Sequence, residues 1–214
     1  MDALKHKTMP TLQRYTGPFN GFEWMNFDDL PNSQGYKMEI YIRDSEVSVD
    51  AMILSFHHLF RATEHQILIH PFNPEGIWGN FCLDTWNIDT EDYDYSTTSK
   101  KDPTLSYLRM LEESHIEPEY AGFCTCLNWD KFLYITMHCI MEHMAVYGTM
   151  FYIENTQIAF YFHHTGSIGV YYRELNKAVK QIICTAMEHD MHICHYNDDR
   201  LSGIIGQSGL HGER

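Results

Sequence analysis

The chain has 214 residues, of which 44% are apolar, so a packed core is expected and wholesale disorder is excluded. Asp and Glu number 29 against 15 Lys and Arg, and the formal charge of −14 argues against a protein that grips nucleic acid over its whole surface. The sequence shows no long uncharged apolar run and no signal-peptide pattern, and its six cysteines are too sparse for a disulfide scaffold. We therefore expect a cytoplasmic protein with reduced thiols that binds neither nucleic acid nor a membrane.

The first third of the chain predicts a loop-rich start, then a strand, a helix and a second strand. Residues 1–36 mix turn-forming residues with aromatic residues, which predicts a loop-rich lead-in. Residues 37–43 alternate between polar and apolar residues and should form a strand. Asp44 or Ser45 is expected to cap the helix that follows, and residues 66–70 should form the second strand.

The middle of the chain combines an acidic run with two predicted helices. Apolar residues recur at helical spacing within 103–114 and 128–146, and Asn128 is placed to cap the second helix. Residues 84–94 are acidic, a pattern typical of a solvated loop, a cation site or a DNA-like charged surface. The acidic residues are Asp84, Asp89, Glu91, Asp92 and Asp94, with Trp86, Tyr93 and Tyr95 close by in the sequence.

The last third predicts a hairpin followed by a strand–helix–strand unit. Residues 150–153 and 157–163 are apolar and flank a tight turn at Asn155, which predicts the hairpin. The elements expected after it are a strand at 167–172, a helix from Arg173, a strand at 191–196 and a short helix at 201–207. Because the strands of a βαβ crossover run parallel, we expect the strands on either side of the longer helix to lie parallel in one sheet.

The junction between the strand at 167–172 and its helix is a candidate anion site. The helix carries an apolar stripe formed by Leu175, Val179, Ile182, Ile183 and Ala186. A strand that runs directly into a helix exposes the first backbone N–H groups of that helix, and these donors, with the helix dipole, favour phosphate. We therefore expect a phosphate or pyrophosphate beyond the strand, with Lys177 and Lys180 adding positive charge nearby.

The same junction reads Arg173-x-x-Asn176-x-Ala178, which resembles the Q/R-x-x-G-x-G/A signature of the GNAT-type N-acetyltransferases. Asn176 stands where that signature has its central glycine. The order of predicted elements over residues 37–62 and 147–210 is also similar to the core of that family.

The resemblance implies an α/β (α+β) fold with a central mixed β-sheet flanked by helices. It implies a single domain at 37–214 with an inserted helical segment at about 72–146. It also implies a CoA-dependent N-acyltransferase, with acetyl-CoA as co-substrate and an amine of a small molecule or protein as acceptor. Acetyl-CoA would lie along the strand, its pantetheine paired with the strand backbone and its pyrophosphate on the junction. The implied cofactor-binding residues are Val170, Arg173, Glu174, Leu175, Asn176, Lys177 and Ala178.

In such an enzyme the amine would attack the thioester directly, so a base is needed to accept its proton. His164 and Glu154 are the candidate catalytic residues. A histidine titrates near neutral pH, which suits a base, and only one of the adjacent His163 and His164 can face the site because strand side chains alternate. We prefer His164.

Other hypotheses stay open beside this one. The sequence from His163 is similar to the H-H-x-x-x-D-G motif of chloramphenicol acetyltransferase-like enzymes, without the Asp. A zinc site is a second alternative, with Cys124, Cys126, Cys139 and His143 as its ligands. The third is a non-enzymatic acidic interaction protein, or a nucleic-acid mimic, that binds a basic partner. Protection by acetyl-CoA would favour the enzyme, and salt-sensitive binding to a basic protein without CoA binding would favour the interaction protein.

Overall fold

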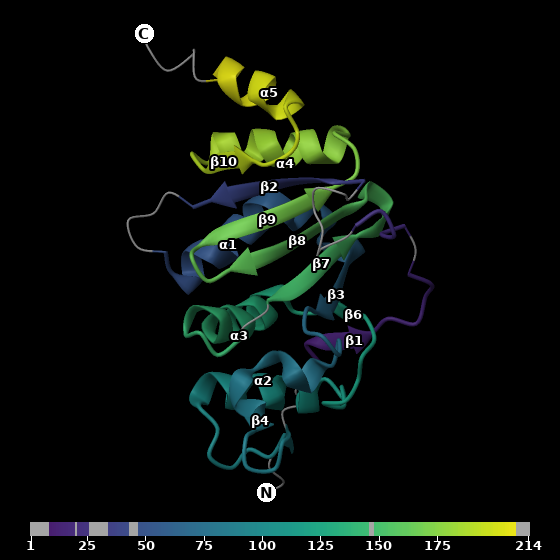
Figure 1. Cartoon of the computed structure of the whole chain (residues 1–214), viewed down its shortest axis with the longest axis vertical. Helices are drawn as coiled ribbons and strands as arrows, with labels where there is room; N and C mark the ends of the chain where they lie inside the picture. Colours follow the sequence, from purple (N-terminus) through teal and green to yellow (C-terminus); the bar gives the residue numbers. More distant parts are fainter. Residues whose placement is uncertain (1–8, 20, 26–33, 43–46, 146–147, 209–214) are drawn as a thin grey trace, which may run out of the picture. The chain divides into compact units, whose positions relative to one another are not determined.

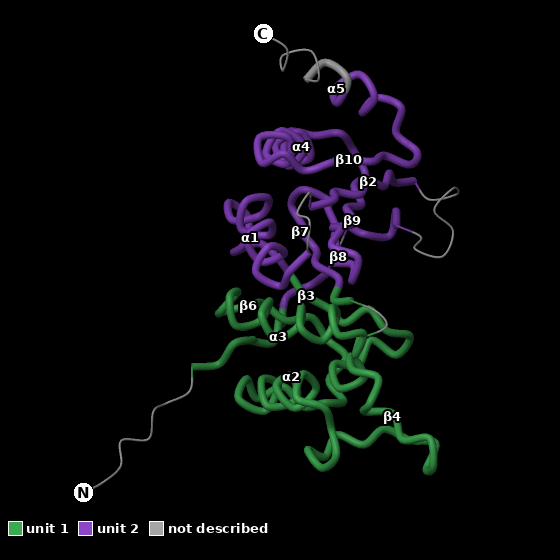
Figure 2. Tube along the Cα trace, turned by 90° about the vertical axis from the view of Figure 1, so that its left-hand side faces the viewer, with its two compact units in different colours: residues 1–16, 68–149 green, residues 17–67, 150–214 purple. Residues whose placement is uncertain are grey.

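The computed structural model describes residues 9–19, 21–25, 34–42, 47–145 and 148–208 (Figure 1). The chain divides into two compact units, shown in different colours in Figure 2. Unit 1 is formed by residues 1–16 and 68–149, and unit 2 by residues 17–67 and 150–214. The segment expected as an insertion, 72–146, lies within unit 1. No helix among the described residues has the length and apolar character needed to cross a membrane.

Unit 2 is built on an antiparallel sheet. Its strands are β2 (Tyr36–Tyr41), β7 (Thr149–Ile153), β8 (Ile158–His163), β9 (Ser167–Tyr172) and β10 (His192–His195). They lie in the order β7-β8-β9-β2-β10, and each neighbouring pair is antiparallel. The expected mixed α/β class is confirmed, but the expected mixed sheet is wrong for this part of the chain. β9 and β10 do run in the same direction, as predicted, yet β2 lies between them.

Two helices cover one face of this sheet. α1 (Val49–Phe60) and α4 (Lys177–Glu188) lie on the same side of the strands in Figure 2. Met38 and Ile40 of β2 point to that side and are fully buried, with Phe56 of α1. The 3-10 turn Arg61–Gln66 follows α1, the turn Glu154–Thr156 joins β7 to β8, and α5 (Arg200–Ser208) follows β10.

The N-terminus of α1 differs from the prediction. Ser48 is the N-cap, and its hydroxyl oxygen accepts a hydrogen bond from the Ala51 N–H at 3.1 Å. The predicted caps, Asp44 and Ser45, lie outside the described residues. All three residues are competent caps, so local preference did not distinguish them.

Unit 1 contains strands as well as helices. Its strands β1 (Leu12–Arg14), β6 (Cys124–Cys126) and β3 (Ile67–Pro71) pair antiparallel in that order. A separate hairpin is formed by β4 (Trp86–Asn87) and β5 (Asp92–Tyr93), and the 3-10 turns Trp78–Phe81 and Leu83–Thr85 precede it. Its helices are α2 (Asp102–Glu113) and α3 (Trp129–Met141). The inserted segment is therefore not purely helical.

Helix α3 begins where the sequence predicts and ends earlier. The Asn128 side chain accepts a hydrogen bond from the Lys131 N–H at 3.1 Å, which confirms the predicted cap. The helix stops at Met141 rather than near 146, and His143 adopts a left-handed φ of 56°. A left-handed residue cannot continue a right-handed helix, so the chain turns away there.

Candidate functional site

The predicted cofactor junction is capped by one of its own side chains. Asn176 is the N-cap of α4, and its Oδ1 accepts a hydrogen bond from the Val179 N–H at 3.1 Å. Its Nδ2 donates to the Thr156 carbonyl at 2.9 Å, and its backbone N–H donates to the Glu174 carbonyl at 2.7 Å. The residue in the glycine position of the signature therefore uses one of the first donors of α4 itself. Arg173 also has its N–H directed at a carbonyl, that of Gln157, at 3.4 Å.

The strand expected to hold pantetheine is paired on both sides. β9 matches β8 and β2 residue for residue along its whole length, and fully buried Val170 lies opposite both Phe160 and Met38. A backbone paired on both sides has no donors or acceptors left for a third partner. The expected pairing of pantetheine with this strand is therefore wrong.

The two candidate catalytic residues lie at opposite ends of β8. Glu154 begins the turn before this strand, and His164 is exposed in the turn after it. A six-residue strand spans roughly 20 Å, which is too far for two side chains to act on one proton. The structure thus places Glu154 near the start of α4, where Asn176 contacts Thr156, and leaves His164 at the other end.

A charged cluster that no sequence pattern indicates lies on the face of the unit 2 sheet that carries Glu39. Glu39 of β2 is only 8% exposed, and its carboxylate accepts hydrogen bonds from Ser167 Oγ at 2.5 Å and Tyr196 Oη at 2.7 Å. The Lys37 ammonium lies 3.8 Å away. Burial alone would raise the pKa of Glu39, but the two hydrogen bonds and Lys37 outweigh it and hold that pKa below its ordinary value.

This cluster ties strands together rather than activating a nucleophile. The Ser167 hydroxyl is fully buried and donates a hydrogen bond to the Glu39 carboxylate, so a substrate cannot reach it as a nucleophile. The bonds connect β2 with β9 and with the residue after β10. Glu39 is best described as a structural anchor of the sheet.

The cysteines of the zinc hypothesis do not gather as that hypothesis requires. Cys139 Sγ lies 3.7 Å from the Sγ of buried Cys82, while His143 is exposed. Burial raises the pKa of the Cys124 thiol to about 12, which disfavours the thiolate that zinc binds. Within the described ranges, no three His, Cys, Asp or Glu side chains lie close enough together to hold a metal ion.

The first and last carboxylates of the acidic run accept hydrogen bonds from neighbouring residues of unit 1. Asp84 accepts hydrogen bonds from Thr104 Oγ1 at 2.5 Å and from the Lys101 N–H at 3.0 Å, so it holds the start of α2. Asp94 accepts from the Ser96 N–H at 2.8 Å and from Lys100 Nζ at 3.3 Å. The Ser96 backbone bond, with bonds from the Ser96 hydroxyl and Lys100, holds the pKa of Asp94 below its ordinary value.

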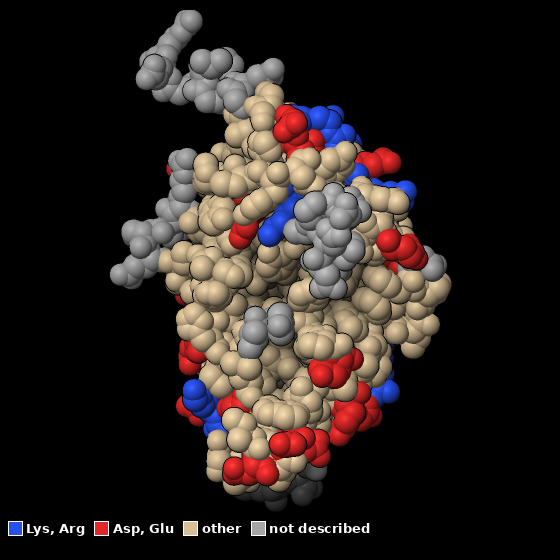
Figure 3. Space-filling view, in the orientation of Figure 1, with Lys and Arg blue, Asp and Glu red and all other residues tan. Residues whose placement is uncertain are grey.

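The hairpin between these two carboxylates exposes acidic and apolar side chains together. Asp89, Glu91 and Asp92 are exposed. Trp86 is 44% exposed and Ile88 is 81% exposed. On the face drawn in Figure 3, acidic side chains gather over the part of unit 1 in which Figure 1 places β4. A group of exposed apolar side chains rimmed by polar residues is a common mark of an interaction surface.

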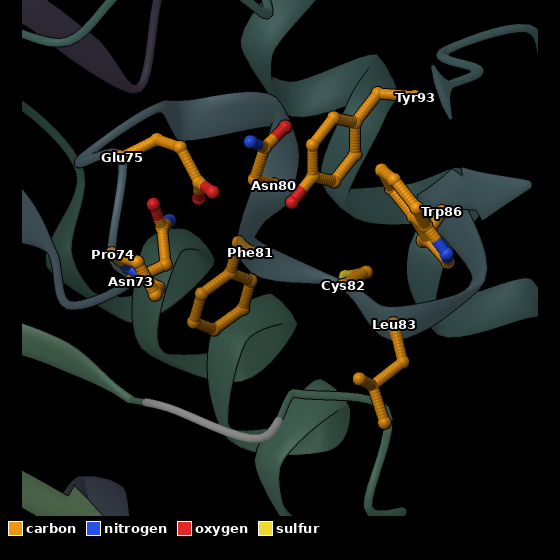
Figure 4. A pocket seen from close by; sticks show the side chains of 9 residues that line it. All are labelled: Asn73, Pro74, Glu75, Asn80, Phe81, Cys82, Leu83, Trp86 and Tyr93. Atoms are coloured by element: carbon orange, nitrogen blue, oxygen red, sulfur yellow. The ribbon is translucent and has the colours of Figure 1, made fainter. Parts of the chain in front are cut away.

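A pocket opens beside the hairpin, and Figure 4 shows its lining. Its volume is about 130 Å³. The rings of Trp86 and Tyr93 meet edge to face, with centroids 5.0 Å apart. The Glu75 carboxylate and the Tyr93 hydroxyl point into the space beside Asn80 in Figure 4. In the sequence, Trp86 and Tyr93 stand out only as neighbours of the acidic run, and no pattern there points to Glu75 or Asn80.

A comparison of the chain with family models, curated proteins and solved structures gave no match to any of them. What the chain does must therefore follow from its own residues.

Proposed function

We propose that the chain is a non-enzymatic interaction protein that binds a basic protein or peptide through the β4–β5 hairpin. The observation that carries this proposal is the exposure of Trp86 and Ile88 next to Asp89, Glu91 and Asp92. Protein interfaces combine a few large apolar anchors with a polar rim, and carboxylates in the rim select a basic partner.

The charge balance of unit 1 supports the same partner. Three of its cations are already paired with its own carboxylates: Arg14 with Glu117, Lys100 with Asp94 and Lys131 with Glu113. These three cations therefore do not neutralise Asp89, Glu91 or Asp92. A negative field of this kind raises the rate at which a cationic partner arrives, and salt screens it.

The test is the binding of a labelled lysine-rich peptide, followed by fluorescence polarisation over a range of salt concentrations. Because the whole chain is acidic, the informative comparison is between two variants with the same change in charge. The hairpin variant combines Asp89→Asn, Glu91→Gln and Asp92→Asn. The control combines Asp50→Asn, Glu188→Gln and Asp199→Asn, which are exposed carboxylates of unit 2.

We expect the hairpin variant to bind at least about tenfold more weakly than the control at low salt, since each exposed charge contributes up to about 1 kcal/mol. Trp86→Ala should weaken binding at high salt as well, because the charges are then screened and the apolar contact of the parent remains. Equal binding by the two charge variants would refute the proposal, because the peptide would then respond only to net charge.

A further inference from the structure

The pocket beside the hairpin has the size of a small planar group. Its volume is about 130 Å³. One water needs about 10–15 Å³ on the same measure, so the pocket is large enough to admit a small planar group such as a guanidinium. Walls of this kind, apolar and aromatic with a few polar groups, are typical of specific binding pockets.

The pocket is negatively charged and lacks a cation of its own. None of its lining residues is Lys or Arg. Glu75 is exposed, and it has no ion-pair partner in the part of the chain that the structure describes. Burial, together with the Glu75 charge, raises the pKa of Tyr93. Burial and the charges of Glu119, Asp92 and Glu75 raise the pKa of Tyr95 to about 12. The phenols therefore stay neutral, and their rings present electron-rich faces inside a negative field.

Asn80 adds a donor that needs an acceptor. Its Oδ1 accepts a hydrogen bond from the Tyr95 hydroxyl at 2.7 Å. Its Nδ2 is buried and has no hydrogen-bond partner among the described residues. A buried amide donor without a partner is unfavourable, and a carbonyl oxygen brought by a bound peptide would satisfy it.

We infer that this pocket receives an arginine side chain of the basic partner, an inference that rests on the proposed function. The guanidinium plane packs against the Tyr93 ring, which lies between Glu75 and Trp86 in Figure 4, and its N–H groups pair with the Glu75 carboxylate. Trp86 supports that ring through its edge-to-face contact. Arginine is preferred over lysine because a planar guanidinium stacks on aromatic rings and matches a carboxylate with two parallel hydrogen bonds, whereas an ammonium is more strongly hydrated.

The experiment compares an arginine-rich and a lysine-rich peptide of equal length and charge. We expect the parent chain to bind the arginine peptide at least about tenfold more tightly, as a bidentate charge-assisted pair allows. Glu75→Gln and Trp86→Ala should each bring the two affinities together. The matched control is Glu91→Gln, which removes one charge from the same hairpin outside the pocket lining, and it should weaken both peptides equally.

A direct readout uses a small probe, N-acetyl-arginine methylamide, and the indole N–H resonance of Trp86, assigned from its loss in Trp86→Phe. We expect this resonance to shift with the arginine probe and to stay in place with the lysine analogue. Circular dichroism of Glu75→Gln checks that the exposed substitution leaves the fold intact.

The outcomes separate the two proposals. If both peptides bind equally and both depend on the hairpin carboxylates, the proposed function stands and the arginine pocket is overturned. If the arginine preference of the parent persists in Glu75→Gln, the pocket is also overturned. If neither peptide depends on the hairpin, both proposals fall.

Discussion

Replacing Asn176 with alanine tests how the start of α4 is held. The side chain makes two hydrogen bonds that alanine cannot make, one from the Val179 N–H at 3.1 Å and one to the Thr156 carbonyl at 2.9 Å. The first caps the helix, and the second joins the helix to the β7–β8 turn. Both belong to unit 2, so their loss should be felt within one compact unit.

The two bonds set the expected magnitude. Loss of an N-cap side chain costs typically about 1 kcal/mol, and a second hydrogen bond contributes a further ~1 kcal/mol. Asn176→Ala should therefore lower the free energy of unfolding by about 2 kcal/mol. For a chain of this size the midpoint of thermal unfolding should fall by about 4–8 °C.

Asn176→Asp separates the two contributions. The carboxylate keeps the cap acceptor and interacts favourably with the positive end of the helix dipole, but it cannot donate to Thr156. We expect this variant to lose no more than about 1 kcal/mol and to lie between the parent and the alanine variant.

Urea unfolding followed by circular dichroism measures all three proteins under the same conditions. An alanine variant within about 0.5 kcal/mol of the parent would refute the assignment of Asn176 as a cap, since that is the range of ordinary surface substitutions. An aspartate variant no more stable than the alanine variant would refute the capping contribution specifically.

Two further predictions concern acetyl-CoA and pH. Acetyl-CoA in large excess should leave the midpoint of thermal unfolding unchanged, because β9 is paired on both sides and Asn176 caps α4. A ligand present at about a hundred times its dissociation constant would stabilise the fold by about 2.7 kcal/mol. A clear upward shift of the midpoint would therefore restore the acyltransferase hypothesis. The pKa of Glu39 lies below its ordinary 4.5 in the folded chain, so its ionised form contributes stability that is present above pH 4.5 and is lost as the pH falls through the folded value. As the pH falls, the free energy of unfolding of the parent should thus approach that of Glu39→Gln. Urea titrations at a series of pH values measure both, and a difference between the two proteins that does not change with pH would contradict this account.

The longer elements were predictable because each repeats a local pattern. The stripe predicted for α4 is confirmed at Val179, Ile182, Ile183 and Ala186, all of which are buried. The strand predicted at 167–172 coincides with β9. Several turns of a helix, or several alternations of a strand, are enough for the period to stand out from chance.

Short elements carried too little pattern to be found. β1 and β6 have three residues each, and β4 and β5 have two. Such strands exist because a neighbouring strand pairs with them, and no period can be read over two or three positions. The hairpin that displays Trp86 was therefore seen only as an acidic run.

In the candidate site, too, some features follow from residues close in the sequence and others only from residues far apart. The alternation of residues 37–43 places Lys37, Glu39 and Tyr41 on one face of a strand. The partners of Glu39 are Ser167 and Tyr196, which are 128 and 157 residues away in the chain. Nothing local in the sequence joins these three residues. The pocket is similar, since Glu75 and Tyr93 come from segments on either side of two 3-10 turns.

By itself, the sequence determined which long segments coil or extend, where α3 begins, and that the chain is strongly acidic. Those properties depend on residues a few positions apart and on composition. Only the tertiary structure decided that β2 lies between β9 and β10, and this order closes both edges of β9 and brings Ser167 and Tyr196 to Glu39. The physical reason is that strand order depends on which distant segments pair best, and the hydrogen bonds and side-chain contacts that decide it form only when the chain has folded.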